Sequence, residues 1–211
     1  MQKRNKELTR KLILDTALDK FAEKGFDGAS ISQIAKAAKV NQALIYYYFE
    51  NKQAIIAELL NEFIDTANSF LVEIAIKGYV YGSDEMEDQM TKYNTHILNN
   101  DKVLRLLITE SMKDTYDVPP IFKLIDFDVP GALEPELVDE MNQKGFNFDQ
   151  DAHQRRVTEF FTGIMPTIVY SLFRCKWSTH FNLAQGQLDT LFTAANDMTH
   201  NSHHQNEKKN K

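Results

Sequence analysis

The chain has 211 residues, of which 43% are hydrophobic and 26% charged, a composition typical of a folded globular protein rather than a disordered one. No run approaches the ~18 consecutive apolar residues that a membrane span needs, so we expect no membrane segment. The net charge of −6 is uneven, because residues 1–60 carry +3 and residues 61–211 carry −9. This asymmetry favours the amino-terminal part as the side that meets a polyanion, although an excess of three charges is also compatible with a solvated surface.

Two features indicate a cytoplasmic protein. The single cysteine, Cys175, cannot form an internal disulfide, which agrees with a reducing compartment. The first ten residues are basic but have no apolar run behind them, so we expect no secretory signal.

Apolar spacing of three to four residues, few prolines and no hairpin turn signal predict an all-α protein. The first helix is predicted over residues 6–24 and ends at Gly25. The same spacing predicts later helices over residues 52–77, 83–98, 101–113, 134–145, 151–174 and 183–200. Pro166 is expected to kink the helix that contains it. The segment 115–131 is rich in proline, and a short helix or a loop fits it equally well.

The stretch from Ser30 to Lys52 holds two short helices joined by a compact turn. Ser30 and Gln33 form a capping box at the start of the first helix, and Asn41 caps the second. This pattern is typical of the helix-turn-helix motif, whose second helix enters the major groove of DNA.

Side chains of the second helix suit DNA recognition. Gln42 can bond an adenine edge, and Ala43 can contact a thymine methyl group. Tyr46 and Tyr47 carry hydroxyls that can bind phosphate. A structural interpretation is equally open for some of these residues, because Tyr46 or Tyr48 can instead be a core ring.

Residues 9–56 resemble the amino-terminal signature of the tetracycline-repressor (TetR) family. The residues that carry the resemblance are Arg10, Ile13, Ala17, Phe21, Gly25, Phe26, Ser30, Ile34, Ala35, Ala38, Val40, Leu44, Ile45, Tyr46, Tyr48, Phe49, Lys52 and Ile55. The resemblance implies a dimeric DNA-binding regulator, most often a repressor, that binds a palindromic operator and releases it when a small molecule enters the carboxy-terminal domain. The remaining three quarters of the chain resemble the family only in length and helical pattern.

The resemblance also implies which residues meet DNA. Carried over by position, and with the turn cation Lys39 added, the set is Ser32, Lys39, Asn41, Gln42, Ala43, Tyr46, Tyr47 and Lys52. The basic pair Lys3 and Arg4 is expected to add a phosphate or minor-groove contact. Lys39 departs from the family pattern, which commonly has glycine there, and a positive φ at this lysine would cost ~1 kcal/mol. Ala43 and Leu44 also depart from it, since glycine and threonine are frequent at these positions.

The last two long helices are unusually apolar for surface helices and predict a four-helix interface between two subunits. The predicted interface residues are Phe161, Met165, Ile168, Val169, Leu188, Leu191, Phe192 and Ala195. The same face can also pack within one subunit. A protein that binds a palindromic DNA site must hold two DNA-binding domains, here called heads, ~34–36 Å apart, and this requirement favours the dimer.

The middle of the chain is rich in phenylalanine, tyrosine and methionine, as apolar ligand pockets are. The predicted ligand-binding residues are Phe63, Phe70, Tyr93, Ile97, Met112, Tyr116, Phe122 and Phe160. An ordinary helical core explains any one of them equally well. We expect an apolar or aromatic effector whose binding changes the distance between the two heads of the dimer. The helix that begins at Lys52 joins the head to the rest of the chain and is expected to transmit this change.

The predicted domains are residues 1–51 for DNA binding, 52–200 for ligand binding and dimerisation, and 201–211 as a disordered polar tail. Phosphate-loop, dinucleotide and zinc-peptidase motifs are lacking, so we expect no enzyme, no cofactor and no metal site. The leading hypothesis is a transcriptional repressor that a ligand releases from its operator. The alternative is an interaction protein of the same fold whose head binds another protein.

Overall fold

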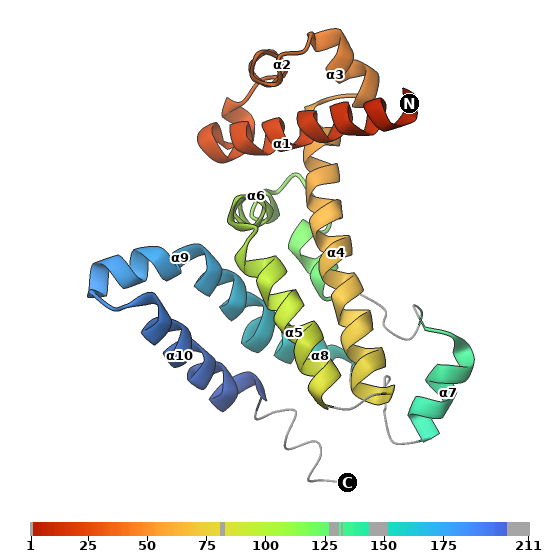
Figure 1. The fold of residues 1–211 in the computed structure, drawn as a ribbon, viewed down its shortest axis with the longest axis vertical. Helices are drawn as coiled ribbons and strands as arrows, with labels where there is room; N and C mark the ends of the chain where they lie inside the picture. The colour runs from red at the N-terminus through yellow and green to blue at the C-terminus, as the bar shows by residue number, and fades with distance from the viewer. Residues whose placement is uncertain (1, 81–82, 127–130, 132, 144–151, 202–211) are drawn as a thin grey trace. The chain divides into compact units, whose positions relative to one another are not determined.

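The computed structural model describes residues 2–80, 83–126, 131, 133–143 and 152–201, and every regular element in these ranges is a helix (Figure 1). The all-α prediction is therefore confirmed. The chain divides into two compact units, Met1–Thr66 with Lys102–Phe122, and Ala67–Asp101 with Lys123–Lys211. The functional boundary predicted after residue 51 stays a prediction, because compactness does not show which residues bind DNA. The predicted tail lies almost wholly outside the described residues.

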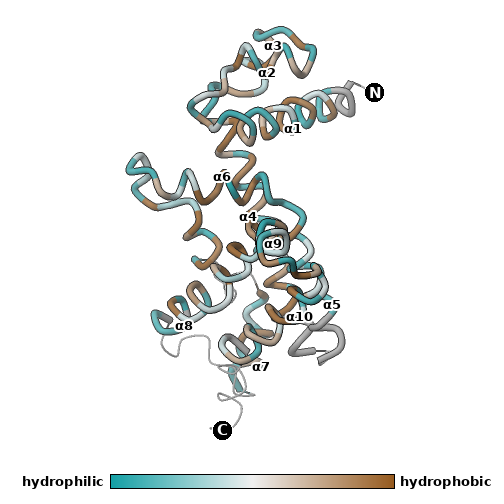
Figure 2. The backbone as a smooth tube through the Cα atoms, turned by 90° about the vertical axis from the view of Figure 1, so that its left-hand side faces the viewer, coloured by the Kyte–Doolittle hydropathy of each residue, from teal (hydrophilic) through white to brown (hydrophobic). Residues whose placement is uncertain are grey.

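The first unit is built on three helices, α1 (Gln2–Gly28), α2 (Ile31–Ala38) and α3 (Gln42–Tyr48). α1 carries apolar and polar residues in alternation along its length (Figure 2). α1 packs against α2, and α2 packs against α3. The side chains of these helices that are at most 2% exposed are Ile13, Ala17, Phe21, Ile34 and Ile45. Each such burial of a large side chain stabilises the fold by about 1.5–3 kcal/mol, so this small core holds the two short helices in place.

α1 turns sharply at Gly25, where φ is 72° and ψ is 163°. This conformation strains any residue with a Cβ atom, which explains the glycine. The helix that the sequence predicts to end here therefore does change direction, and a last turn through Gly28 leads the chain to α2.

The first unit also contains the start of α4 (Lys52–Val80) and all but the first residue of α6 (Asp101–Ser111). α6 buries Leu104 and Leu107 completely, and its Lys102 forms a 2.7 Å ion pair with Asp19 of α1. The segment 115–131, for which the sequence fits a helix and a loop equally well, contains a short 3₁₀ helix, η1 (Pro120–Leu124).

The second unit contains the rest of α4 together with α5 (Ser83–Leu98), α7 (Pro135–Gln143), α8 (Ala152–Thr158), α9 (Met165–Phe181) and α10 (Gln185–Asn196). α9 and α10 form an antiparallel pair (Figure 1), joined through Asn182 in the left-handed conformation. Within the described residues, none of the helices combines the length and the apolar content needed to cross a membrane.

The helix predicted over residues 151–174 is present as a helical run from Ala152 to Phe181, with a π-helical segment inside it. α8 ends at Thr158, the π-helix η3 (Glu159–Ile164) follows, and α9 then continues to Phe181. Pro166 lies at the start of α9, where a missing N–H costs least. The preceding N–H, of Met165, donates to the carbonyl of Phe160 five residues back. The i→i−5 hydrogen bond therefore lies directly before the proline.

Candidate nucleic-acid interface and ligand cavity

The turn between α2 and α3 depends on Lys39, which adopts the left-handed conformation with φ 56° and ψ 39°. Its N–H donates to the Lys36 carbonyl at 3.3 Å, and the Val40 N–H donates to the Ala35 carbonyl at 3.0 Å. These two hydrogen bonds are the Schellman arrangement that ends many helices. The positive φ considered at this lysine is therefore present, and it costs about 1–2 kcal/mol for a residue with a Cβ atom.

Side-chain caps fix the starts of both short helices. The Gln33 N–H donates to Ser30 Oγ at 3.2 Å, and the Ser30 N–H donates to Gln33 Oε1 at 3.3 Å. Asn41 Oδ1 accepts from the Leu44 N–H at 2.7 Å. Both predicted caps are confirmed. Because the Asn41 oxygen is used in capping, its amide NH₂ is the group left to face a ligand.

Eight exposed side chains on α2, the turn and α3 are here called the reading face. They are Ser32, Lys36, Lys39, Asn41, Gln42, Ala43, Tyr46 and Tyr47. Between them, Ile45 and Phe49 point into the core and are at most 3% exposed, so α3 presents a fixed side outward. Tyr46 is 54% exposed, which removes the core interpretation for its ring, whereas Tyr48 is half-buried.

Lys6 of α1 reaches the reading face and donates a 2.9 Å hydrogen bond from Nζ to the Tyr47 hydroxyl. The ammonium group also lies 5.5 Å from the centroid of the Tyr47 ring. The hydrogen bond with Tyr47, followed by electrostatic attraction to the same residue, raises the pKa of Lys6. Lys6 is therefore charged at neutral pH. The side chains of Lys3 and Arg4, predicted as a basic arm, lie outside the described residues.

Unlike the other residues predicted to contact DNA, Lys52 is hydrogen-bonded to the protein backbone. Its Nζ donates to the carbonyl of Phe26 at 2.7 Å and to the carbonyl of Ala29 at 2.9 Å. These carbonyls belong to the corner between α1 and α2. Two of the three ammonium donors are thus committed to the backbone, and the phosphate contact predicted for Lys52 stays a prediction.

A second lysine approaches the same corner from beyond the end of α6. Lys113 Nζ lies 4.9 Å from the centroid of the Phe26 ring and pairs with Asp27 at 3.0 Å and Glu110 at 2.7 Å. Glu110 is buried, and it also accepts a 3.2 Å hydrogen bond from the Tyr116 hydroxyl. Partial burial lowers the pKa of Lys113, but the hydrogen bonds to Glu110 and Asp27 outweigh it and raise the pKa overall.

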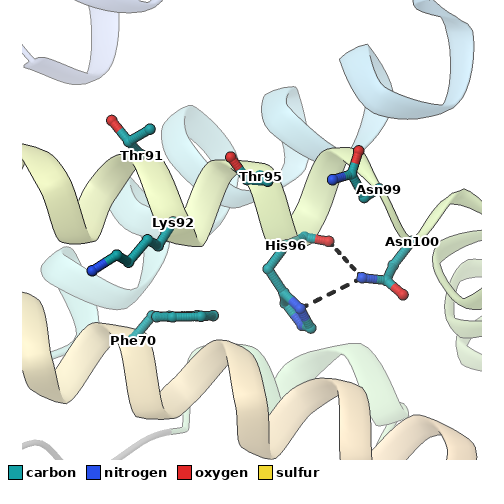
Figure 3. Close-up of a pocket in the computed structure, with 7 residues that line it drawn as sticks. All are labelled: Phe70, Thr91, Lys92, Thr95, His96, Asn99 and Asn100. Atoms are coloured by element: carbon teal, nitrogen blue, oxygen red, sulfur yellow. Dashed lines mark hydrogen bonds between the residues drawn. The ribbon is translucent and has the colours of Figure 1, made fainter.

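The second unit has a shallow depression of about 430 Å³ beside α5, open to solvent and here called the cavity. Its lining is Phe70, Thr91, Lys92, Thr95, His96, Asn99 and Asn100. Figure 3 shows Phe70 of α4 facing Lys92 and His96 of α5, and the Phe70 and His96 rings are 5.8 Å apart. Asn100 Nδ2 donates to the His96 carbonyl at 2.8 Å. The cavity therefore combines one aromatic surface with hydroxyl, amide, imidazole and ammonium groups.

Of the eight predicted ligand-binding residues, four belong to the first unit and four to the second. Phe70 is the one member that lines the cavity beside α5. Phe63, Tyr93 and Ile97 are at most 8% exposed and belong to the packed interior. Tyr116 and Phe160 are half-buried. Met112 is 81% exposed and Phe122 is 42% exposed, so these two lie on the surface of the single chain.

The predicted dimer residues fall into three groups by exposure. Ile168 and Leu188 are buried within the single chain, so they pack inside the subunit. Met165 and Phe192 are half-buried, and Phe192 stacks on Tyr170 with ring centroids 3.9 Å apart. The exposed members are Phe161, Val169, Leu191 and Ala195. Further large apolar residues with exposed side chains extend this face along α9, and they are Phe173, Trp177 and Phe181.

Apart from Phe70, sequence reasoning missed the residues around the cavity, and it also missed the contacts of Lys6 and Lys113. On α5, the cavity side chains form the pairs Thr91–Thr95 and Lys92–His96, each four residues apart, and Asn99 and Asn100 continue this spacing just beyond the end of the helix. Such polar rows also occur on any solvated helix face, so the spacing alone does not single them out. Lys6 and Lys113 were missed because their partners lie 41 and 86 residues away.

Comparison with known proteins places the helix-turn-helix region in a described family. Residues 13–59 match the family "Bacterial regulatory proteins, tetR family". The chain is 38% identical over 68 residues to the HTH-type transcriptional regulator YuxN of Bacillus subtilis (strain 168), which covers 32% of the chain and 23% of YuxN. It is 26% identical over 165 residues to YdgC of the same strain, covering 77% of the chain and 80% of YdgC. It is 33% identical over 60 residues to IcaR of Staphylococcus aureus (strain Newman), a negative transcriptional regulator of the biofilm operon icaADBC, covering 28% of the chain and 32% of IcaR.

Solved structures share the fold over most of the chain. The fatty acid degradation regulator FadR of Bacillus halodurans superposes with a TM-score of 0.57 at 23% identity, covering 90% of this chain and 95% of FadR. FadR of Bacillus subtilis, solved in complex with stearoyl-CoA, gives a TM-score of 0.54 at 18% identity, covering 89% and 96%. At these identities the likeness concerns the fold. The first matched relative, YuxN, is covered over less than a quarter of its own length.

Proposed function

We propose that this chain, which belongs to the tetR family of bacterial regulatory proteins, is a dimeric repressor that releases a palindromic operator when a small molecule binds. The family consists of transcription regulators rather than enzymes. The proposal rests mainly on the reading face, which presents polar and aromatic side chains on a helix-turn-helix held rigidly by caps and a buried core. The DNA it reads lies in the bacterial cytoplasm.

Recognition begins at the amino-terminal end of α3. Gln42 and Ala43 are exposed there, where helix-turn-helix proteins contact base edges. Tyr46 and Tyr47 follow one turn later with exposed hydroxyls, and such hydroxyls bind phosphate and set the register of the helix on the duplex. Lys39 adds a cation beside them. The head thus has residues that contact bases, here called the base-reading edge, and residues that bind the phosphates of the DNA backbone.

Dimerisation is proposed through the α9–α10 face. Val169, Phe173, Trp177 and Phe181 recur at every fourth position of α9 and are 47–57% exposed. A row of this kind packs into the grooves of a second helix, and a second copy of the chain would cover it. A two-fold dimer would place two reading faces ~34–36 Å apart, as a palindrome requires. IcaR, a relative, is a negative regulator, which supports repression.

The cavity beside α5 is proposed as the effector site. Phe70 offers the apolar or aromatic contact that the composition of the chain predicts, whereas Lys92, His96 and the two asparagines add polar contacts. The effector is therefore a small molecule with an apolar or aromatic part and a polar group. B. subtilis FadR was solved with stearoyl-CoA, so acyl-CoA thioesters belong among the first compounds to test.

A gel-shift titration against the DNA upstream of the protein's own gene tests DNA binding. With several phosphate contacts, log K falls by ~0.9 per contact for each log unit of salt. Absent or salt-independent binding would instead favour a head that binds another protein. Effector release is tested separately, by adding each compound that raises the melting temperature to the operator complex. If every such compound leaves operator affinity unchanged, the release step is wrong.

A further inference from the structure

We propose that Lys6 and Tyr47 together bind one phosphate of the DNA backbone, as a pair here called the phosphate clasp. The inference rests on the proposed DNA-binding function. It adds a DNA-binding residue from α1, which lies ahead of the helix-turn-helix motif in the sequence, and it brings two elements of the head onto the same phosphate.

The hydrogen bond inside the clasp leaves both residues able to bind an anion. Lys6 Nζ donates to the Tyr47 hydroxyl at 2.9 Å, so the hydroxyl oxygen is the acceptor. The hydroxyl proton of Tyr47 remains available, and so do two protons of the ammonium group. Both side chains are exposed. A phosphate oxygen placed beside the pair would accept from the ammonium and from the hydroxyl, and both would be charge-assisted hydrogen bonds.

The charge of Lys6 is not neutralised by a carboxylate in the described part of the chain. Its partner there is a neutral phenol, whereas Arg10 pairs with Glu58 and Lys113 pairs with Asp27 and Glu110. An uncompensated cation on a reading surface raises the local concentration of anions. Among the residues that the structure describes, a phosphate that binds Lys6 would have no acidic side chain to displace.

The position of Lys52 strengthens the case for Lys6. Two of the three ammonium donors of Lys52 are occupied by the carbonyls of Phe26 and Ala29, and its Nζ lies 4.3 Å from the centroid of the Phe26 ring. Lys52 therefore stabilises the corner of the head. Lys6 is the lysine that contacts a tyrosine of the reading face and keeps two donors for DNA.

The clasp is also ordered before DNA arrives. A free lysine side chain loses up to ~2 kcal/mol of rotamer entropy when it is fixed. The hydrogen bond to Tyr47, whose ring is held edge-on against Tyr48 at 5.1 Å, meets part of this cost in the free protein. Preorganisation of this kind increases affinity without a new contact.

The test measures DNA affinity by fluorescence anisotropy across salt for the full-length protein. The variants are Lys6→Ala, Lys6→Arg, Tyr47→Phe and the double variant Lys6→Ala/Tyr47→Phe. Lys11→Ala is the matched control, because Lys11 is an exposed lysine on the same helix but on a different face, five residues further on. Circular dichroism melting confirms that each variant folds. Every variant is measured on the operator and on an unrelated duplex.

The slope of log K against log salt is negative. We expect Lys6→Ala to make it less steep by ~0.9 for each half-site, on both duplexes. Lys6→Arg and Lys11→Ala keep the wild-type slope. Tyr47→Phe weakens binding at an unchanged slope, because the residue it removes is neutral. The double variant loses less affinity than the two single losses combined, since both residues bind the same phosphate.

Two results overturn the clasp and are distinguishable from failure of the proposed function. If the wild-type protein binds with a steep salt dependence but Lys6→Ala keeps the slope of Lys11→Ala, Lys6 does not bind phosphate. If the losses of Lys6→Ala and Tyr47→Phe add fully, the two residues do not share a phosphate. If the wild-type protein binds neither duplex, the DNA-binding function itself is wrong.

Discussion

The Lys52 ammonium group lies 4.3 Å from the centroid of the Phe26 ring and donates a 2.7 Å hydrogen bond to the Phe26 carbonyl. The first residue of α4 is thereby fastened to the corner between α1 and α2. Lys113 lies 4.9 Å from the centroid of the same ring, so two cations from distant parts of the sequence converge on one phenylalanine. Both lysines therefore contact the corner at which the chain passes from α1 to α2.

Replacing Lys52 by alanine is expected to destabilise the head. The substitution leaves the carbonyls of Phe26 and Ala29 without their donor, and a hydrogen bond to a charged group contributes about 1.5–3 kcal/mol. Urea unfolding followed by circular dichroism measures the change in the free energy of unfolding. Lys36→Ala, at an exposed position of α2, is the control and should change it by less than about 0.5 kcal/mol. Equal stabilities for the two variants would contradict the role of Lys52 at the corner.

Lys39→Gly is expected to stabilise the protein. It removes about 1–2 kcal/mol of left-handed strain, while the greater freedom of glycine in the unfolded chain returns about 0.5–1 kcal/mol. The net gain lies between about 0 and 1.5 kcal/mol and centres on ~0.7 kcal/mol, which urea unfolding can detect. Lys36→Gly, in the helical part of α2, should lose about 1 kcal/mol. A loss of stability in Lys39→Gly would show that the lysine side chain contributes more than its backbone costs.

Gln42→Ala is expected to relax the preference for one base position in each half-site. A good bidentate contact between glutamine and adenine is worth about 1–3 kcal/mol of discrimination. Binding-site selection from random duplexes measures this preference directly. Gln53→Ala, exposed on α4, is the control and should select the wild-type sequence. An unchanged consensus for Gln42→Ala would remove Gln42 from the base-reading edge.

Tyr93 should make the protein sensitive to alkaline pH. Burial, and then the charge of Glu159, raises the pKa of Tyr93 to about 12, from 10.0 for a free phenol. The folded state therefore holds its proton more tightly than the unfolded state does. Below pH 10 this phenol causes no change in stability with pH, and between about pH 10 and 12 it lowers the free energy of unfolding by about 1.4 kcal/mol per pH unit.

Urea unfolding at a series of pH values measures this slope. In Tyr93→Phe, the free energy of unfolding should fall less steeply than in wild type over the alkaline part of the curve, here called the alkaline limb. Tyr46→Phe, at an exposed ring, should keep it. If the Tyr93→Phe limb is as steep as that of wild type, the buried phenol is not the group responsible.

Phe173→Glu is expected to disrupt the proposed dimer, because it introduces a charge into the exposed apolar row of α9. Analytical ultracentrifugation measures the molecular mass in solution. Leu8→Glu, at another exposed apolar residue but on α1, is the control and should stay dimeric. A monomeric wild-type protein, or a dimeric Phe173→Glu, would place the dimer interface elsewhere or exclude it.

Local signals explain why so much of the head could be predicted from sequence. The caps at Ser30 and Asn41 and the left-handed Lys39 depend on residues within five positions of each other, and the same is true of apolar helix spacing. The π-helix before Pro166 was not predictable in this way. Whether a proline kinks a helix or shifts its hydrogen bonding depends on how the flanking turns pack.

The candidate sites were predictable only in part for the same reason. The reading face follows from helix periodicity, because α3 must bury Ile45 and expose its other side. The clasp depends on a contact between residues 41 positions apart, and the corner depends on Lys113 reaching Asp27 across 86 positions. Such pairs form only when the whole unit has folded, and a single sequence carries no local pattern for them.

Binding-site selection with the wild-type protein and random duplex DNA is the most direct test of the central claim, that this chain is a dimeric operator-binding regulator. We expect enrichment of an inverted repeat whose half-site centres lie one helical turn apart, ~10–10.5 base pairs, or a small multiple of it. No enriched sequence, or enrichment of a single asymmetric half-site, would contradict it.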